Sequence, residues 1–457
     1  MTENAPRARA MSGTTGADVD AALEHVRTAE REAGNLPGLP QLDPGWRPGR
    51  AAVVGAGTMG GGIAMALASA GVPVTLIDRS TQDLDRGLSR VAANYAASVR
   101  RGRLDEAEAD RRLARISRAI GLEAVGDADV VVEAVFEELS VKQDVFRAID
   151  QHARPGTLLG TNTSALDIDA IASVTSRSQD VVGAHFFSPA QVMRLLEVVP
   201  GAQTAPLTVA RLMALGRLMG KVPVRAGNAR GFIGNAMLFD YYRESLFLVE
   251  EGAFPADVDR VLTGFGFAMG PFTMTDMAGH DLGVESRRRA IATRPESRRY
   301  ADLDLLLVDL GRLGQKSGAG WYRYAEGDRT PRPDPEMNQR IVEYSARIGI
   351  ERRRIGDDEI LRRCLCALVN RAAWLLGEGI AAKPGDVDVV YVTGYGFPAA
   401  RGGPLYWADS VGLATVLDGV EHLHRTHGAW WEPAPLLRRL GRANATFSGL
   451  GTTGAPA

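Results

Sequence analysis

The sequence predicts an α/β domain with a mostly parallel sheet, followed by two copies of an all-helical domain. Short apolar runs alternate with helical patterns from about residue 50 to residue 226, which is typical of a parallel sheet covered by helices. After Gly227 long helical periodicity dominates, and two stretches of that part share one sequence pattern. The chain has 457 residues, too many for a single hydrophobic core, so several domains are expected.

The composition excludes some classes of function. The apolar share of 45% and the charged share of 24% are ordinary for a globular protein, and a net charge of −2 gives no electrostatic argument for binding nucleic acid. No apolar run is long enough for a membrane span, and the first twenty residues lack the apolar centre of a signal peptide. The two cysteines, Cys364 and Cys366, would point to different faces of a helix. We therefore expect a cytoplasmic protein.

The first 48 residues are expected to form a tail and a linker helix. The charged segment ALEHVRTAEREAG has a helical pattern, and the Pro/Gly-rich segment NLPGLPQLDPGWRPG after it is typical of a linker. The α/β domain is expected to span residues 49–226. Its strand candidates are the apolar runs AAVVGAG, VPVTLID, ADVVVEAV, TLLGTNTS, VVGAHFF, LLEVV and VPVRAG.

A glycine-rich turn follows the first of these runs and leads into an Ala-rich helical segment. It contains Gly55, Gly57, Thr58, Met59 and Gly60 in the spacing of a dinucleotide-binding turn. The first glycine permits the tight turn, the second lets a pyrophosphate approach the backbone, and the third allows the helix to pack closely on the strand. The N-terminus of the helix would supply N–H groups to the phosphates. This context predicts a Rossmann-type dinucleotide-binding domain.

The second strand candidate ends in an acid, Asp78, eighteen residues after Gly60. A carboxylate there would accept hydrogen bonds from a ribose hydroxyl and repel a 2′-phosphate. We therefore expect NAD as the cofactor in preference to NADP. Arg79, the next residue, weakens that preference slightly.

Two ionisable residues lie in apolar surroundings in HFFSPAQVMRLLEVV at 185–199. His185 closes one strand candidate, and Glu197 lies within the next. Ligands of open α/β sheets bind beyond the carboxyl ends of strands, where a histidine can exchange a proton near neutral pH. A neighbouring carboxylate would fix its tautomer and stabilise the imidazolium. Hydride transfer from a carbinol carbon requires such a base, because the hydroxyl proton must leave as well.

The helical part contains an internal repeat. LVEEGAFPADVDRVLTGFGFAMGP at 248–271 aligns with LLGEGIAAKPGDVDVVYVTGYGFPAARGGP at 375–404, and Asp276 and Asp409 follow at the same distance from their Gly-Pro pairs. We interpret this as a duplication of one helical domain. The first copy is expected over residues 227–326 and the second over 355–450, with a linker at 327–354 between them.

Several motifs together resemble the 3-hydroxyacyl-CoA dehydrogenase family. They are HFFSPAQVMRLLEVV, VVGAGTMGGGIA, GFIGNAML, GQKSGAGWYRY at 314–324 and GYGFPAARGGPLYWAD at 394–409, so the resemblance runs from about residue 50 to 450. The chain looks like the dehydrogenase half of the multifunctional, peroxisomal-bifunctional-like enzymes of fatty-acid oxidation. AEREAGNLPGLP at 29–40 resembles the linker helix before that half. The enoyl-CoA hydratase domain that normally comes first is expected to be absent, because 48 residues are too few for it.

The resemblance implies roles for individual residues. His185 looks like the catalytic acid/base and Glu197 like its orienting carboxylate. Ser164, in TNTSAL, and Asn235, in GFIGNAML, look like substrate-positioning residues. Ser188 stands where many members carry asparagine, which suggests the multifunctional branch. On the cofactor side, the resemblance implies three further contacts, namely Glu137, Lys142 and Lys316. Taken alone, Ser164 could instead be a helix N-cap and Asn235 a helix-surface residue.

The activity implied is the reversible, NAD-dependent oxidation of (S)-3-hydroxyacyl-CoA to 3-oxoacyl-CoA. The alternatives are oxidation of a free 3-hydroxy acid, biosynthetic reduction of a 3-oxoacyl thioester, and a non-catalytic NAD-binding role. No metal is expected, since the histidines of HLHRTH at 422–427 match no metal-ligand spacing. An acyl-CoA thioester is the expected substrate, a separate enoyl-CoA hydratase is a possible partner, and the two helical copies would pair within a monomer.

Overall fold

The structure is a computed structural model that describes residues 16–450 except 283, 296 and 297. The chain divides into two compact units, each described by itself below. The α/β unit comprises Arg27–Asn235 and Gly379–Gly394. The helical unit holds Ala236–Glu378 together with the described residues before Arg27 and after Gly394. The expected α/β domain followed by helical domains is therefore confirmed as a fold class.

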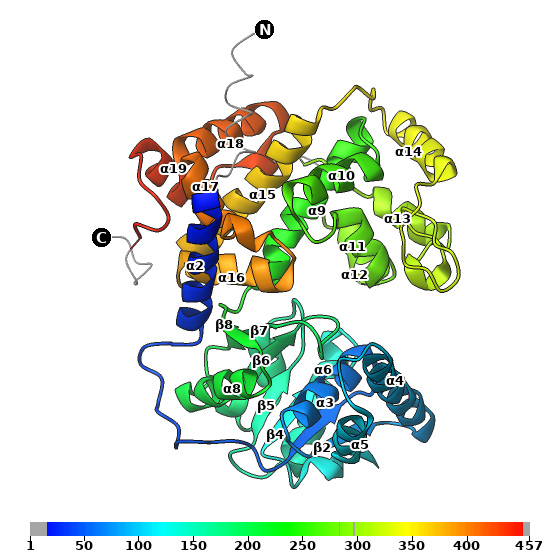
Figure 1. The fold of residues 1–457 in the computed structure, drawn as a ribbon, viewed down its shortest axis with the longest axis vertical. Coiled ribbons are helices and arrows are strands. Elements are labelled where there is room, and N and C mark those ends of the chain that lie inside the picture. The colour runs from blue at the N-terminus through cyan, green and yellow to red at the C-terminus, as the bar shows by residue number, and fades with distance from the viewer. Residues whose placement is uncertain (1–15, 283, 296–297, 451–457) are drawn as a thin grey trace. The chain divides into compact units, whose positions relative to one another are not determined.

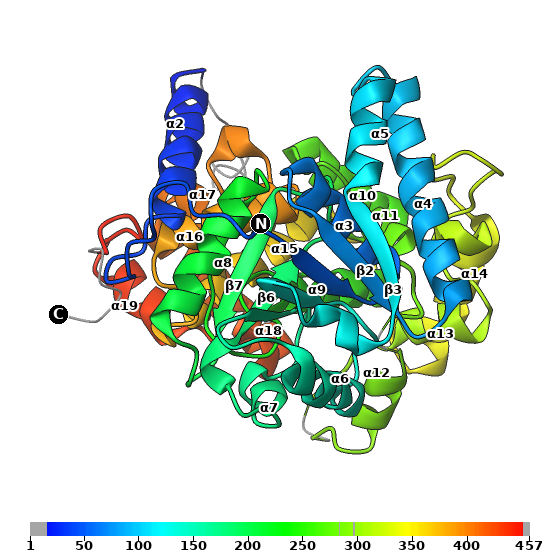
Figure 2. The same cartoon turned by 90° about the horizontal axis from the view of Figure 1, so that it is seen from below.

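The α/β unit is built on an eight-stranded sheet with the strand order β3-β2-β1-β4-β5-β6-β7-β8 (Figure 1). The strands pair in parallel except β7, which runs antiparallel to β6. Figure 2 shows α3 and α8 on one face of the sheet and α6 and α7 on the other. The strands are β1 (Ala51–Val54), β2 (Val74–Asp78), β3 (Ile116–Ile120), β4 (Val130–Glu133), β5 (Leu158–Thr161), β6 (Val181–Phe186), β7 (Leu195–Pro200) and β8 (Val222–Arg225). The helices are α3 (Thr58–Ser69), α4 (Thr81–Arg100), α5 (Glu106–Ala114), α6 (Leu139–His152), α7 (Ile168–Ala172), α8 (Pro206–Leu218) and α16 (Pro384–Gly394).

The central strands are buried on both faces, which explains their nearly uninterrupted apolar sequence. Every residue of β1, β4 and β5 is buried. Each of the seven apolar runs of the sequence coincides with a strand. The eighth strand, β3, lies at the edge of the sheet and reads ISRAI, with exposed and partly buried residues. Because none of its residues is fully buried, β3 has no apolar run, and hydrophobic patterning did not reveal it.

The reversal between β6 and β7 has a direct consequence for two side chains. The register of the antiparallel pair sets His185 directly opposite Glu197. Directly opposed residues on neighbouring strands have side chains on the same face of the sheet. The register of β6 against β7 thus brings the two ionisable groups together near the carboxyl end of β6.

The helical unit contains the long helices α9 (Gly234–Glu251) and α15 (Asp357–Gly377). Cys364 and Cys366 are free, buried thiols of α15, and burial raises the pKa of each to about 12. The other helices are α10 (Pro255–Phe265), α11 (Pro271–Ala278), α12 (Val284–Ile291), α13 (Leu303–Asp309), α14 (Pro335–Arg347), α17 (Pro404–Val411), α18 (Leu413–His427) and α19 (Pro435–Arg442). The charged N-terminal segment forms α2 (Gly16–Ala33), whose residues are divided between the two units.

The two repeated segments carry the same local contacts. The carboxylate of Asp276 accepts the consecutive backbone N–H groups of Trp321 and Tyr322, at 2.8 and 3.0 Å. In the second copy, the carboxylate of Asp409 accepts the consecutive backbone N–H groups of Phe447 and Ser448, at 2.7 and 2.9 Å. A buried or part-buried carboxylate thus fastens each copy's last segment to its Gly-Pro helix.

The corresponding Gly-aromatic-Gly-Phe turns of the two copies pack against each other. The rings of Phe267 and Phe397 meet edge to face with centroids 5.1 Å apart. A Cβ atom on Gly266 would lie 2.9 Å from Pro398, and one on Gly396 would lie 2.9 Å from Ala268. Because each turn contributes the same positions to the contact, the packing has the reciprocal character of a two-fold interface.

One segment differs from expectation. The residues 327–354, expected as a linker, include the helix α14. Asp334 accepts a hydrogen bond from the backbone N–H of Glu336, and Pro335 occupies the first helical turn. An aspartate N-cap followed by proline is a strong signal for the start of a helix. It was not recognised, because the other prolines of TPRPDP are typical of a linker. The domain boundaries given above stay a prediction.

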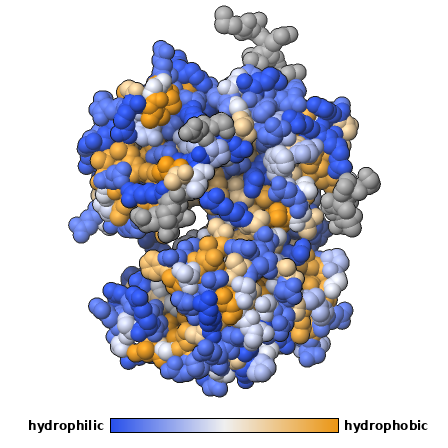
Figure 3. Space-filling model, turned by 180° about the vertical axis from the view of Figure 1, so that it is seen from behind, coloured by the Kyte–Doolittle hydropathy of each residue, from blue (hydrophilic) through white to orange (hydrophobic). Residues whose placement is uncertain are grey.

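Within the described part of the chain, no helix is both long and apolar enough to cross a bilayer. Hydrophobic residues lie among hydrophilic ones on the face shown in Figure 3.

Candidate active site

The glycine-rich turn between β1 and α3 has the geometry of a phosphate cradle. Gly55 has φ +103°, and a Cβ atom there would lie 2.6 Å from the carbonyl oxygen of Ala134. A Cβ atom on Gly60 would lie 1.8 Å from the carbonyl oxygen of Gly55, so neither position tolerates a side chain. Around Gly57, by contrast, a Cβ atom would meet nothing within 4 Å. The turn is therefore closed on its protein side and open at Gly57, where a pyrophosphate can approach.

The N-terminus of α3 is ready to bind an anion. Gly57 is its N-cap, and no side chain caps the helix. Thr58 is exposed, whereas Met59 is half-buried and packs against the hydrophobic core of the α/β unit. The backbone N–H groups of a first helical turn have no partner within the helix, and the helix dipole makes this end favourable for phosphate. That the five residues indicated by the sequence contact the cofactor stays a prediction.

Asp78 ends β2 and faces this turn. Its Oδ2 atom accepts the backbone N–H of Ala56 at 2.6 Å, and its Oδ1 atom accepts the N–H of Arg79 at 2.7 Å. Each carboxylate oxygen keeps a further lone pair with which it can accept a ribose hydroxyl. The Arg79 side chain is 89% exposed and pairs with Asp83 at 3.7 Å.

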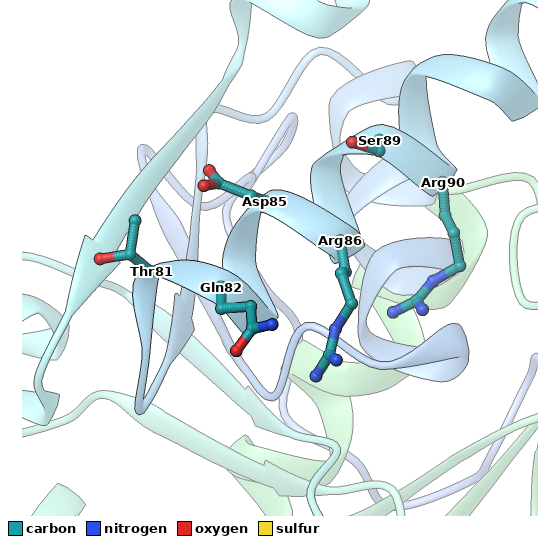
Figure 4. Close-up of a pocket in the computed structure, with 6 residues that line it drawn as sticks. All are labelled: Thr81, Gln82, Asp85, Arg86, Ser89 and Arg90. Atoms are coloured by element: carbon teal, nitrogen blue, oxygen red, sulfur yellow. The ribbon is translucent and has the colours of Figure 1, made fainter.

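A shallow hollow of about 710 Å³ runs along α4 beside the turn. The side chains of Gln82, Arg86 and Arg90 extend to the same side of the helix (Figure 4). Arg90 donates a hydrogen bond to the carbonyl oxygen of Ala56 at 2.7 Å and so braces the turn. Sequence reasoning missed Arg90. A sequence signal for Arg90 did exist. Gln82, Arg86 and Arg90 follow Asp78 at intervals of four residues, which places them on one side of a helix.

His185 and Glu197 are hydrogen-bonded partners. The Nδ1 atom of His185 lies 2.7 Å from Oε2 of Glu197, and the two side chains are 6% and 0% exposed. An ionised carboxylate only accepts hydrogen bonds, so Nδ1 carries the proton and Nε2 presents its lone pair. The rings of Phe187 and Phe232 lie 4.4 and 5.6 Å from the imidazole centroid and restrict its orientation.

The second oxygen of Glu197 is held by backbone groups that sequence reasoning missed. Oε1 accepts the N–H groups of Ile233 and Gly234, at 3.1 and 3.0 Å. These groups lie at the start of α9, where the helix dipole stabilises a negative charge. The contact joins residues 36 and 37 positions apart, and their apolar sequence carries no signal for it.

Ser164 follows β5, in the turn before α7, and lies beside Glu137. Its Oγ atom and its backbone N–H both bond to Oε1 of Glu137, at 3.0 and 2.7 Å. The N-cap of α7 is Asp167, so Ser164 does not cap that helix. The amide of Asn235, in the first turn of α9, donates to the carbonyl oxygen of Ser164 at 3.2 Å. Asn235 is thus tied to the turn that carries Ser164.

Lys142, on α6, lies behind Glu137 and is 1% exposed. Its ammonium group is 2.7 Å from Glu133 and 3.3 Å from Glu137. Burial opposes the ionisation of Glu137, but Lys142 and the hydrogen bonds from Thr163 and Ser164 lower its pKa below the usual range.

Lys316 lies in the helical unit, in a short 3₁₀ turn at Gln315–Ser317, and pairs with Asp281. Its predicted contact with the cofactor stays a prediction. Among the residues that the structure describes, no group of three or more His, Cys, Asp or Glu side chains is arranged to hold a metal ion.

Comparison with known families decides the identity of the chain. The model of the 3-hydroxyacyl-CoA dehydrogenase NAD-binding domain matches residues 50–229. The model of the C-terminal domain of the same family matches residues 231–324 and again residues 360–449. The chain belongs to the 3-hydroxyacyl-CoA dehydrogenase family. NAD is therefore its cofactor, as the turn and Asp78 indicated, and the chain is an oxidoreductase of this NAD-dependent class.

Relatives of this family resemble the chain over most of its length. The peroxisomal bifunctional enzyme of Danio rerio is 43% identical over 404 residues, which cover 85% of this chain and 56% of that protein. The crystal structure of 3-hydroxybutyryl-CoA dehydrogenase from Escherichia coli K12 is 30% identical, with a TM-score of 0.74, covering 87% of this chain and 99% of that one. The dehydrogenase part of multifunctional enzyme 1 from C. elegans is 27% identical, with a TM-score of 0.65, covering 91% and 96%. The chain spans little more than half the length of the bifunctional relatives.

Proposed function

We propose that this member of the 3-hydroxyacyl-CoA dehydrogenase family oxidises (S)-3-hydroxyacyl-CoA thioesters to 3-oxoacyl-CoA, reversibly, with NAD. The observation that carries the proposal is the buried His185–Glu197 pair near the carboxyl end of β6, in the sheet that also holds the dinucleotide turn. Bound NAD supplies the hydride acceptor. The chain supplies the base, the electrostatic support for that base, and the groups that position the reactants.

His185 is the proton acceptor in this proposal. Its Nε2 atom takes the proton of the C3 hydroxyl as hydride leaves C3, so that an imidazolium forms. Glu197 stabilises that charge through Nδ1, while the N–H groups of Ile233 and Gly234 hold the carboxylate in place. In the reverse direction the imidazolium returns its proton to the C3 oxygen. Because oxidation releases a proton, low pH favours reduction.

The proposal extends to the setting of the enzyme. The reciprocal packing of the two helical copies supports a monomer, since one chain already contains the pair of copies. Two buried, unpaired cysteines support a reducing cytoplasm, although the relatives named above include peroxisomal enzymes. A separate enoyl-CoA hydratase is the proposed partner, because the relatives are bifunctional enzymes.

A spectrophotometric assay tests the activity. The purified chain, incubated with NAD and (S)-3-hydroxybutyryl-CoA and then with longer homologues, should produce absorbance at 340 nm, and NADP should support much less. NADH formation from free 3-hydroxybutyrate but from no thioester would contradict the proposal. So would NADH binding without turnover of any substrate of either kind.

A further inference from the structure

The peptide between Ala56 and Gly57 is held on one side by the helix α4. Its carbonyl oxygen, on Ala56, accepts a hydrogen bond at 2.7 Å from the guanidinium of Arg90, which is drawn in Figure 4. Gly87, three residues before Arg90, brings the backbone of α4 very close to the same oxygen. A Cβ atom on Gly87 would lie only 2.6 Å from it. The carbonyl of Ala56 is therefore directed at α4.

The other end of this peptide faces the opposite way. In a planar trans peptide the C=O and N–H bonds point in opposite directions. Because the Ala56 oxygen is directed at α4, the N–H of Gly57 is directed away from that helix. Gly57 is exposed and is the N-cap of α3. The N–H groups that follow, on Thr58 and Met59, have no partner within the helix. The peptide thus leads directly into the donor-lined start of α3.

A reversal of this peptide is sterically open to glycine. It would carry the φ angle of Gly57 from −67° to a positive value, which glycine adopts readily. A Cβ atom on Gly57 would meet nothing within 4 Å, so there is room around this residue. The preceding peptide, by contrast, is fixed at both ends. Its N–H, on Ala56, bonds to Asp78 at 2.6 Å. Its carbonyl oxygen, on Gly55, packs against Gly60.

The direction of the peptide decides which charge a ligand meets. With the Ala56 oxygen on α4, the start of α3 presents N–H groups, which carry partial positive charge and favour phosphate. After a reversal, the carbonyl oxygen would take the place of the Gly57 N–H. An acceptor with partial negative charge would then face the phosphates where a donor had been.

We propose that Arg90 is a positioning residue for cofactor binding, which locks the Ala56–Gly57 peptide with its carbonyl turned away from the pyrophosphate of NAD. Without this lock, part of the free protein holds the reversed peptide, and only the remainder binds the cofactor. The apparent Kd then rises in inverse proportion to the competent fraction. Arg90 acts on the free protein and does not itself contact the phosphates. The inference concerns NAD binding alone and does not depend on the substrate of the proposed reaction.

Stopped-flow measurement of NADH fluorescence tests the lock. In Arg90→Met the association rate constant should fall about 5- to 20-fold, as expected for the loss of one charge-assisted hydrogen bond. The dissociation rate constant should stay unchanged, because the bound state already has the correct peptide. ADP-ribose, which carries the pyrophosphate without the nicotinamide, should lose the same factor of affinity in a competition titration. Arg90 is exposed, so thermal melting should show a folded variant.

Two controls separate the lock from the charge of Arg90. The measurements are repeated in about 1 M sodium chloride, where a Debye length of about 3 Å removes the long-range attraction of NADH. The loss in association rate should persist there. The matched variant is Arg118→Met, because Arg118 is 58% exposed and pairs at 2.7 Å with Asp85 of α4. It removes a cation beside the same helix and should change neither rate constant.

Three results would overturn the inference. Faster dissociation with unchanged association in Arg90→Met would place Arg90 on the phosphates themselves. A loss that disappears at high salt would reduce Arg90 to a general electrostatic attraction. Unchanged binding of NADH would show that the peptide keeps its direction without Arg90. These measurements use no thioester, so a failure of the proposed oxidation would be seen separately, in the absence of NADH formation.

Discussion

At the scale of single residues, the site depends on one exchangeable proton. Replacing His185 with alanine removes the base and should lower kcat by about 10²- to 10⁴-fold. The Kd of NADH should stay near that of the parent chain, because the glycine-rich turn and Asp78 lie at other strand ends. Stopped-flow or steady-state absorbance at 340 nm measures the first quantity and fluorescence titration the second. Undiminished turnover in His185→Ala would remove His185 from the mechanism.

The catalytic pair and the contacts around it differ in how far they could be predicted from the sequence. The His185–Glu197 pairing could be anticipated, because both residues are ionisable and stand in apolar strands. The backbone donors at Ile233 and Gly234 could not, since an N–H group leaves no trace in the sequence. The buried salt bridge between Glu133 and Lys142 was hidden for a related reason. A glutamate at the end of a buried strand can be recognised as half of a salt bridge only when Lys142 is known to lie beside it.

At the scale of elements, α16 carries a carboxyl group with an unusual proton affinity. Burial raises the pKa of Asp386 to about 7. The negative charge of Glu32 also raises this pKa, whereas the positive charges of Lys383 and Arg225 lower it. The folded state therefore holds a proton that the unfolded state releases near pH 4. The free energy of unfolding should fall as the pH rises from about 4 to about 7.

Asp386→Asn should remove this part of the pH dependence. At pH 8 the variant should be more stable than the parent chain, by about 2 to 4 kcal/mol as an upper range. Urea denaturation at several pH values measures it. Asp257→Asn is the matched control, since Asp257 holds the same position in α10 and accepts the N–H of Phe254 at 3.0 Å. The control removes a carboxylate that accepts a backbone N–H, so it should lower stability at pH 8 instead of raising it. A parallel shift in both variants would contradict the interpretation.

The helices α9 and α15 are joined by a buried ion pair. Arg363 is fully buried, and its guanidinium bonds to Glu244 at 2.5 Å and to Glu251 at 2.6 Å. Arg363→Leu leaves Glu244 as an unpaired buried charge and should cost about 3 to 5 kcal/mol in the free energy of unfolding. Adding Glu244→Leu should recover a large part of that loss. Thermal or chemical denaturation measures both, and a double variant no more stable than the single would show that the charge of Glu244 is not the cause.

Element by element, the sequence was informative where burial was complete. Seven strands, including the largely buried edge strand β8, were recognised from apolar runs, and α2 was recognised from its charged periodicity. The edge strand β3 and the helix α14 were missed, because their residues are polar and half-exposed and depend on neighbours more than on their own pattern. The antiparallel direction of β7 could not be predicted either, because it depends on how the whole sheet is connected.

At the scale of the whole molecule, the two helical copies predict the mass in solution. The mass of one chain is 48.9 kDa. Analytical ultracentrifugation at micromolar concentration should give this value, because the reciprocal contacts around Phe267 and Phe397 are made within one chain. A species of twice this mass at the lowest concentrations would contradict the monomer proposal.

The reciprocal turns have a further consequence, for how the chain can evolve. In a symmetric pair of identical subunits, every substitution at the axis occurs twice and must suit itself. In this chain the two turns are encoded at separate positions of one gene. A substitution in one turn can therefore be compensated by a different substitution in the other. The sequence already records such drift, since Ala268 on one side faces Gly396, and Pro398 on the other faces Gly266. The duplication has thus released this interface from self-complementarity, and the two halves are free to specialise.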